Sequence, residues 1–453
     1  MLKIGWASRD FTPLQPAMIQ GQKHIRIGRD AADPLMLTAL ALDGAAPDSQ
    51  VVLVSFDLAM VLNPLQDAIR ERLRTRLPEL PGDAVIMNAT HTHDGPVLDD
   101  SFYPHPGGDI MTGTAALNWI ADKAADAVVE AWEKRTPRLL SRAFGHAVVG
   151  HNRRAVYANG QALMYGRTND PTFSHIEGYE DHSLDMLFVY EPDGRLSGVV
   201  LDIPCPSQVE EHLKQFSADY WHEVRIELRQ RFGRHLQVLP LCGAAGDQSP
   251  HFLLYGRQEE EMRKRRGLTE RQEIAVRVAD AVARALICTP PHSGDITIAH
   301  RCKRLAFSPR TITRGERDWA MTALNDSIKH GEQQDLWWPK MLRDVAERFD
   351  RGEPMAQKQA EIHVLRLGDA VLATSPFELY QDFGLQIKAR SPAAQTLIVQ
   401  LACGSGLYLP TQRAVDGGHY GAHPAVAPVG PNGGRELVEA TLAAIGELFS
   451  KPV

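Results

Sequence analysis

The chain alternates short apolar runs with turn residues and with longer segments whose apolar positions recur every three or four residues. Val51 to Phe56 (VVLVSF) and Ala84 to Met87 (AVIM) are rich in β-branched residues and are bounded by Asp, Gly and Pro, which predicts two strands. Residues 64–77, between them, have helical spacing. The run Leu35 to Leu42 is compatible with a buried strand or a short helix.

The rest of the chain continues this mixture. Helices are expected from Leu117 to just before Pro137, from Asp219 to the stop at Gly233, and over 274–285 and 434–449. Strands are expected at 147–149, 186–190, 198–203, 238–242, 361–374 and 397–402. No repeat or long linker interrupts them. The pattern favours a mixed α/β fold: a large multi-layer catalytic domain with mixed β-sheets flanked by helices, spanning residues 1–453.

Two helical segments have open interpretations. Residues 257–272 are densely charged with both signs, which is typical of a solvated helix face and less so of a partner-binding patch. Residues 335–351 contain Trp337, Trp338 and Met341, so this helix is either ordinary packing or a lid over an apolar substrate.

Composition narrows the function. The 453 residues include 49 Lys+Arg and 56 Asp+Glu, a net charge of 49 − 56 = −7, which argues against a nucleic-acid partner. The five cysteines are odd in number and contain no CxxC pair, so a reducing compartment is expected. We see no signal peptide and no apolar run long enough to span a membrane. We therefore expect a cytoplasmic protein that acts on a small-molecule substrate. A homo-oligomer is compatible with the sequence.

The strongest chemical motif is NATHTHDGP at 88–96, directly after a predicted strand. His91 and His93 are two residues apart, so on extended backbone both imidazoles lie on one face. Their small neighbours allow both rings to approach one point, and neutral imidazole is a common metal ligand. A metal site is therefore predicted here, against the alternative of two packing histidines.

Further candidates also follow predicted strands. Asp247, Ser249 and His251 lie in GAAGDQSPH, which is either a nucleophilic serine arrangement or an ordinary Gly/Asp/Ser turn, and it is not a GxSxG elbow. Other candidates, each weak alone, are Asn152 and Arg153 in HNRR, Glu378 in SPFELY and Tyr408 in GSGLYLPT. Residues that follow strands converge on one sheet edge, which would bring these segments together.

Taken in series, the segments resemble the neutral (alkaline, non-lysosomal) ceramidase family, over nearly the whole chain and in the expected order. The segments are SRDFTP, DPLMLTALALD, LVSFDL, NATHTHDGP, HNRR, GDQSPH, PFE and GLYLPT. The resemblance implies a zinc-dependent hydrolase that cleaves the amide of N-acylsphingosine or another N-acyl amide. By position it implies zinc ligands at His91, Glu378 and Tyr408, a substrate-facing His93, a required Ser249, and Asn152 and Arg153 near the site.

The chain departs from the family in two ways. Where the family has its second ligand histidine, this chain has Cys205. Either the Cys205 thiolate replaces that imidazole, or His222 supplies the nitrogen, or the site binds metal weakly or not at all. The family's immunoglobulin-like C-terminal domain and secretion signal have no counterpart here, and no membrane-docking segment is evident, so the substrate is left open.

Four hypotheses follow. In the first, zinc activates water, His93 and Asp247 relay protons, Tyr408 or His93 stabilises the oxyanion, and His251 with Ser249 orients the substrate. The second is a metal-independent serine hydrolase that uses Ser249. The third is a TIM-barrel amidohydrolase, which the irregular middle region disfavours. The fourth is a non-catalytic, ceramidase-like binding protein.

Overall fold

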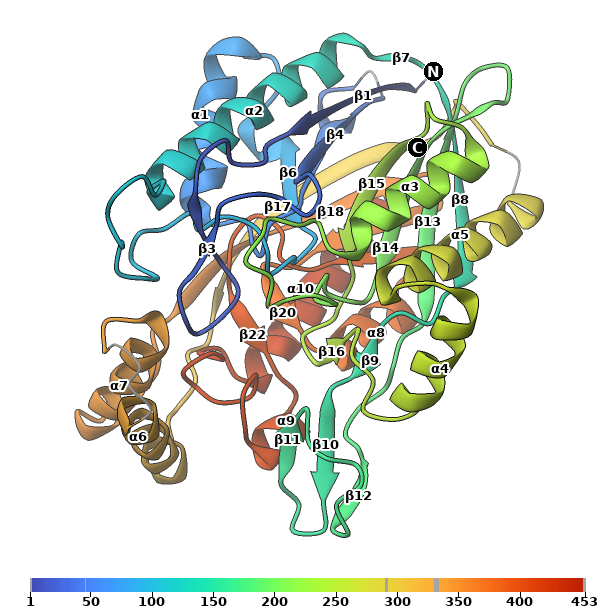
Figure 1. Cartoon of the computed structure of the whole chain (residues 1–453). Coiled ribbons are helices and arrows are strands. Elements are labelled where there is room, and N and C mark those ends of the chain that lie inside the picture. The colour runs from blue at the N-terminus through green and yellow to red at the C-terminus, as the bar shows by residue number, and fades with distance from the viewer. Residues whose placement is uncertain (1, 45, 290–291, 330–333, 451–453) are drawn as a thin grey trace.

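The computed structural model describes residues 2–44, 46–289, 292–329 and 334–450. Three main β-sheets form the centre of the molecule, and helices cover their outer faces (Figure 1). Within the described residues, no helix is both long enough and apolar enough to cross a membrane. The mixed sheets with flanking helices confirm the expected α/β class and exclude a TIM barrel, which needs one closed parallel sheet.

The first sheet carries the N-terminal third of the chain in the strand order β6-β5-β4-β1-β7. Its strands are β1 (Lys3–Asp10), β4 (Met36–Asp43), β5 (Gln50–Phe56), β6 (Val85–Ala89) and β7 (Thr136–Pro137). Helices α1 (Asn63–Arg76) and α2 (Gly113–Glu133) are its neighbours, and α2 packs on β1 and β4. The segment 35–42 is thus a strand, and α2 begins before Leu117, at the Thr112 N-cap, whose side chain accepts a hydrogen bond from the Ala115 N–H.

The second sheet has the order β15-β14-β13-β8 and is covered by two packed helices. It consists of β8 (Leu139–His146), β13 (Ser183–Tyr190), β14 (Leu196–Ile203) and β15 (Gln237–Cys242), with α3 (Tyr220–Phe232) and α5 (Glu270–Cys288). Asp219 caps α3 and Gly233 follows its last turn, as the sequence predicts. Most of the charged segment 257–272 forms α4 (Gly256–Arg266), which has no buried residue and matches the solvated-face interpretation, whereas its end starts α5, where Arg271 is buried and pairs with Asp33.

The third sheet has the order β17-β18-β19-β21. Its strands are β17 (Ile298–Phe307), β18 (Lys358–Leu367), β19 (Ala370–Thr374) and β21 (Gln395–Val399), with α8 (Gln381–Arg390) and α10 (Pro431–Phe449) against them. Helices α6 (Arg314–Lys329) and α7 (Trp337–Asp350) pack on each other at one side of the molecule (Figure 1).

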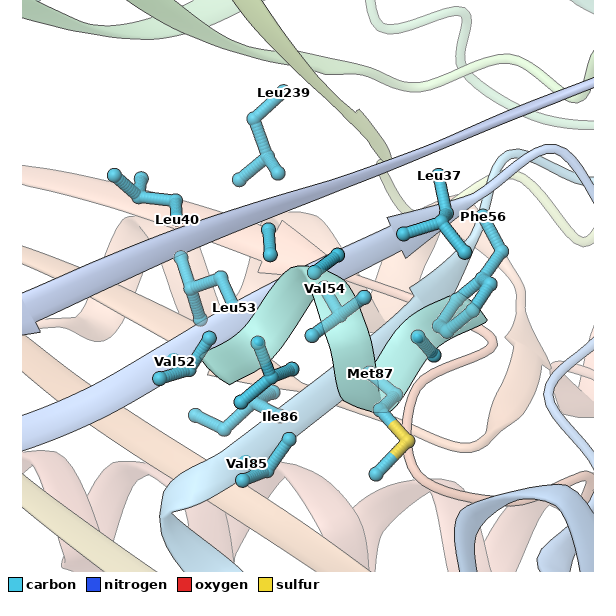
Figure 2. Packing of buried hydrophobic residues seen from close by; sticks show 14 of the residues in the cluster. Leu37, Leu40, Val52, Leu53, Val54, Phe56, Val85, Ile86, Met87 and Leu239 are labelled. Carbon is cyan, nitrogen blue, oxygen red and sulfur yellow. The ribbon is translucent and has the colours of Figure 1, made fainter. Parts of the chain in front are cut away.

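The principal core lies where the first two sheets meet. Figure 2 shows side chains of β4, β5 and β6 packed together with Leu239 of β15. Leu239 is fully buried, and burying a leucine contributes about 1.5–3 kcal/mol. Because strands covered on both faces have no solvent side, β4 and β5 are almost continuously apolar rather than alternating.

Short ribbons connect these sheets and carry most of the motif residues. They are β2 (Ala17–Ile19) with β3 (Arg26–Gly28), β9 (His151–Asn152) with β16 (Gln248–Ser249), β10 (Arg154–Tyr157) with β11 (Ala162–Met164) and β12 (Phe173–Ile176), and β20 (Phe377–Leu379) with β22 (Leu407–Leu409). Helix α9 (Gln412–Gly417) follows β22. HNRR and GDQSPH therefore each contribute one strand to the same two-stranded ribbon, with Ser249 opposite His151.

The strand predicted at 147–149 is wrong. Strand β8 already ends at His146, and residues 147–150 have no strand assignment. Ala147 and Val149 are buried in the core cluster of the second sheet, whereas Val148 is exposed. The alternation that predicted a strand thus reflects side-chain packing of an extended connection without ladder pairing.

Candidate active site

A cavity of about 150 Å³ brings together four of the predicted site residues. His91, His93, Glu378 and Tyr408 line it, and the rest of its wall is mostly apolar and aromatic. The main apolar and aromatic lining residues are Ala59, Met60, Phe102, Tyr103, Trp337, Met341, Leu407, Tyr420 and Val426. Trp337 and Met341 of α7 thus lie on the cavity wall, as the lid interpretation requires, whereas Trp338 is buried in the core cluster of the third sheet.

His91 is held by an unusual backbone conformation just beyond β6. Its φ angle is +64°, a left-handed value that non-glycine residues seldom adopt and that concentrates at functional sites. Its N–H donates to the Leu58 carbonyl (3.0 Å), and its ring Nδ1 lies 2.5 Å from the Ala59 carbonyl oxygen. A carbonyl partner at Nδ1 requires the proton there, so in the neutral ring Nε2 carries the free lone pair.

The other ring nitrogen, Nε2, faces Glu378. His91 Nε2 lies 3.3 Å from Glu378 Oε2, and both side chains are buried. Glu378 and Tyr408 occupy opposite positions in the parallel pair β20 and β22. The ribbon therefore delivers a carboxylate and a phenol side by side to the imidazole.

Arg153 holds the Tyr408 hydroxyl in place through a hydrogen bond. Its Nη2 donates to the Tyr408 hydroxyl (3.0 Å) and to the Gly246 carbonyl (2.8 Å). Gly246 is required by close approach, because a Cβ there would lie 2.4 Å from the Glu378 carbonyl oxygen. The GDQSPH turn, HNRR and the β20–β22 ribbon are thus packed into one unit.

The electrostatics favour an ionised Glu378 carboxylate beside a protonated Tyr408 phenol. Burial alone raises the pKa of Glu378, but His91, Tyr408 and Arg153 together hold that pKa below its usual value. Burial, reinforced by the Glu378 charge, raises the pKa of Tyr408 well above its usual value. The protein without a bound ion thus keeps the Tyr408 phenol protonated and the Glu378 carboxylate ionised at neutral pH.

His93 belongs to a second cluster beside the first. Gln208 Nε2 lies 2.7 Å from His93 Nε2, and because an amide nitrogen can only donate, this ring nitrogen is the acceptor. His93 Nδ1 lies 3.1 Å from Glu211 Oε2, and His251 Nε2 lies 3.4 Å from Glu211 Oε1. The two histidine rings of the HTH motif meet edge to face, with centroids 5.0 Å apart.

The three ionisable groups of this cluster respond differently to their surroundings. Burial lowers the pKa of His93. Burial alone raises the pKa of Glu211, but contact with both histidines moves it far below its usual value. Burial disfavours the charged form of His251, but Glu211 raises its pKa overall. At neutral pH the cluster therefore combines an anionic Glu211 with a neutral His93.

Asp247, Ser249 and His251 do not form a serine-hydrolase triad. The Asp247 oxygens accept hydrogen bonds from the Gln381 N–H (2.9 Å) and from the Asn152 side chain (2.8 Å), while His251 pairs with Glu211. The buried Ser249 hydroxyl accepts from the Tyr165 hydroxyl (3.1 Å) and from the His251 N–H (3.1 Å). Burial raises the pKa of Asp247 to about 6, and its contacts hold the HNRR segment rather than reaching the cavity.

The two candidates for the missing ligand lie outside the cavity lining. Cys205 is fully buried, its thiol donates to the Pro206 carbonyl (3.4 Å), and burial raises its pKa well above the usual value. His222 lies in the first turn of α3, as predicted, and is half-buried. Neither belongs to the residues that line the cavity in the described part of the chain.

The donor set around His91 fits a zinc ion. Two nitrogen or oxygen ligands bound to tetrahedral zinc at about 2.0–2.1 Å lie roughly 3.3 Å apart. The His91–Glu378 contact has this spacing, 3.3 Å. A ligating histidine commonly donates its second ring nitrogen to a carbonyl, and His91 faces Ala59 in this manner.

Sequence reasoning missed Gln208, Glu211 and Tyr165. Glu211 lies in a charged loop segment, VEEHLK, that has neither strand nor helix periodicity. Gln208 lies three residues after Cys205, in a segment that the family resemblance already placed near the site. That proximity could have identified Gln208 from the sequence. Tyr165 has a positive φ of 55°, which is invisible in the sequence.

Comparisons with known proteins bear on the fold. No family model matches the sequence, and no curated protein is significantly similar to it. The neutral ceramidase crystal structure from Pseudomonas aeruginosa superposes with a TM-score of 0.72 at 15% identity, covering 100% of this chain and 75% of that chain. A ceramidase complexed with C2 gives 0.71 at 14% identity, covering 100% and 76%.

The fold is that of neutral ceramidase. The match extends over the whole chain, so the resemblance inferred from dispersed short motifs is confirmed at the level of the fold. The motif residues lie where the ceramidase fold brings together strand ends from all three sheets, which explains how such short segments, far apart in sequence, can reveal it.

Proposed function

We propose that this chain is a zinc-dependent hydrolase of an N-acyl amide. The observation that carries the proposal is the buried His91–Glu378 contact of 3.3 Å, with Tyr408 beside it, at the wall of an apolar cavity. The neutral ceramidase fold supports the same chemistry, because the compared structures are ceramidases. Residues 1–453 act in this proposal as one catalytic unit.

His91 Nε2, a Glu378 oxygen and the Tyr408 oxygen would hold the ion. Bound there, zinc supplies a Lewis acid for the amide carbonyl and lowers the pKa of a water molecule. Arg153 keeps the Tyr408 oxygen in place and balances the charge of Glu378. The fourth protein ligand is Cys205 after a local rearrangement, or His222, or none, with water in its place.

His93 is the proposed proton acceptor. Its Nε2 accepts from the Gln208 amide and its Nδ1 faces Glu211, so the tautomer is correct for taking a proton at Nε2 once the Gln208 hydrogen bond is released. Glu211 stabilises the imidazolium that forms, and His93 then returns the proton to the leaving amine. Ser249 and Asn152 contribute by holding the adjacent loops rather than by forming an acyl-enzyme.

The cavity bears on the substrate class. An apolar cavity of about 150 Å³ takes up a molecule the size of benzene. We therefore propose that the group bound beside the scissile amide is short or compact, and that a lipid-like substrate would place the remainder of its chain outside. Ceramide with a short acyl chain and other N-acyl amides both satisfy this condition.

The test measures hydrolysis and metal content together. Purified protein is treated with a chelator, resupplied with zinc, and assayed on an N-acylsphingosine series from acetyl to palmitoyl and on a non-sphingoid N-acyl amide. We expect chelation to abolish turnover and zinc to restore it. His91→Ala should lose turnover, whereas His175→Ala, an exposed histidine, should not. Turnover that survives both chelation and His91→Ala would refute the proposal.

A non-catalytic binding protein remains the contrasting outcome. It is favoured by Cys205 at the family's histidine position and by the low identity of 15% to the compared ceramidase. Zinc-loaded protein that binds an N-acyl amide without releasing amine would support it.

A further inference from the structure

A second group of metal-ligating side chains lies away from the candidate active site. Cys302, Glu361 and His363 each offer one ligand atom, and these atoms all lie within 4.8 Å of one another. In the described part of the chain, this is the one group of at least three His, Cys, Asp or Glu side chains that meets this spacing. None of the three belongs to the cavity lining of the candidate active site.

The register of two strands produces the group. Cys302 on β17 is directly opposite His363 on β18, and Glu361 precedes His363 by two residues, so all three side chains share one face of the antiparallel pair. Opposite residues in such a pair have Cβ atoms about 4.5–5.5 Å apart, which is close enough for one ion to contact both. The sequence elements are two short spacings, HRC at 300–302 and EIH at 361–363.

Hydrogen-bond partners already orient the Glu361 carboxylate. Glu361 Oε1 accepts hydrogen bonds from Gln66 (3.1 Å) and Arg70 (2.6 Å), both on α1, and lies 2.8 Å from His363 Nε2. Oε2 has one hydrogen bond, from Arg70 at 3.1 Å, and keeps a lone pair. Such second partners on ligating carboxylates and imidazoles are typical of metal sites.

The imidazole is fixed from its other side as well. His300 Nε2 lies 2.9 Å from His363 Nδ1, and the two rings are stacked at 9°. His363 is fully buried, while Cys302 and His300 are half-buried, which leaves a path for an ion from solvent. One thiol, one imidazole and one carboxylate in a partly dry setting match the ligands that zinc prefers.

We propose that Cys302, Glu361 and His363 form a second, structural metal site for zinc, which ties β17 and β18 to α1. Water or His300 completes the coordination. Arg70 offsets part of the negative charge of the thiolate and carboxylate. This site is independent of the proposed hydrolase activity.

Cobalt(II) provides a direct test, because a cobalt–thiolate bond gives a near-ultraviolet charge-transfer band that nitrogen and oxygen ligands do not. The probe is cobalt(II) chloride added to metal-free, full-length protein, with zinc(II) as competitor. We expect the band in the wild type and in His91→Ala, and its loss when Cys302→Ser or His363→Gln is added to His91→Ala, a background that removes any band from cobalt held by Cys205 in the active site. Cys288→Ser, which removes an exposed cysteine, serves as the control and should keep it.

Other outcomes overturn the proposal. They are a missing band in the wild type, a band that persists in His91→Ala/Cys302→Ser, and a band that His91→Ala loses on Cys205→Ser or Cys403→Ser but not on Cys302→Ser. A wild-type measurement guards against misfolded variants: zinc should slow iodoacetamide labelling of Cys302 at least tenfold, read by mass spectrometry. Equal labelling with and without zinc would mean that Arg70, Glu361 and His363 form a closed ion-pair network without metal.

Discussion

Glu378 and Tyr408 lie directly opposite each other on the parallel strands β20 and β22, and both line the same cavity. This pairing makes the carboxylate and the phenol a rigid unit, because neither strand can shift without breaking the ladder. His91 reaches this unit from the first sheet, through a contact of 3.3 Å to Glu378, and Arg153 reaches it from the HNRR segment, through a hydrogen bond of 3.0 Å to Tyr408. The site thus depends on the packing of the first sheet against this ribbon.

Replacing the carboxylate tests this arrangement. Glu378→Gln keeps the size of the side chain but removes the charge that complements His91 and Arg153. We expect zinc content to fall by one ion per chain and kcat/KM to fall at least 100-fold, measured by elemental analysis and amide hydrolysis. Glu133→Gln, on the exposed face of α2, is the matched control and should change neither. Full zinc content in Glu378→Gln would contradict the assignment.

The close approach of Gly246 to Glu378 gives a second prediction. A Cβ at Gly246 would meet the Glu378 main chain at 2.4 and 2.8 Å, which only a backbone shift can relieve. We expect Gly246→Ala to destabilise the fold by about 1–3 kcal/mol and to reduce metal affinity, measured by urea unfolding and zinc titration.

Gly446 is the control for that substitution. It lies in α10, and a Cβ there meets no atom within 4 Å. Gly446→Ala should leave metal binding unchanged and stabilise the fold by about 0.4–1 kcal/mol. Equal effects of the two substitutions would show that the Gly246 contact is not limiting.

The contacts of Glu211 with His93 and His251 predict that the stability of the fold depends on pH. The lowered pKa of Glu211 contributes stability that is present above its unfolded pKa of about 4.3 and is lost as the pH falls. The raised pKa of His251 contributes stability that is present below about pH 6.5 and is lost as the pH rises through its folded pKa. The loss of unfolding free energy caused by Glu211→Gln should therefore be largest, about 1 kcal/mol, between pH 4.5 and 6.5.

Nuclear magnetic resonance titration of the histidine ring signals provides the direct measurement. In Glu211→Gln the pKa of His251 and that of His93 should both fall, because burial continues to disfavour their charged forms. Glu210→Gln is the neighbouring control, since Glu210 pairs with Arg271 instead. Unchanged histidine titration in Glu211→Gln would rule out the proposed coupling.

Removing the Trp337 side chain from the cavity wall should change the substrate size that the protein prefers. Trp337 lines the cavity and its indole N–H donates to the Gln22 carbonyl (3.2 Å). Trp337→Ala should enlarge the cavity and shift the preferred acyl length upward in a competition assay across the N-acyl series. Trp119→Ala removes an indole that also bonds a carbonyl, that of Phe11 (3.3 Å), in a different core cluster. It should leave the preference unchanged.

The helices, the strands and the convergence of the motifs could be predicted from the sequence. Side-chain pairings that depend on strand register or on the course of a loop could not. His91, Glu378 and Tyr408 were predictable because each follows a strand, and strand ends meet at sheet edges. The contacts of Glu211 with two histidines depend on the course of a loop without periodicity. The Cys302–His363 pair depends on the alignment of β17 with β18, in which a one-residue slip would move Cys302 to the other face.

The φ of +64° at His91 has a bearing on how this protein can change. A left-handed backbone costs a side-chain-bearing residue about 1–2 kcal/mol, and glycine escapes that penalty. Glycine at position 91 would therefore increase the free energy of unfolding, but it would remove the imidazole. The imidazole beside Glu378 is therefore held at a cost in stability that glycine would avoid.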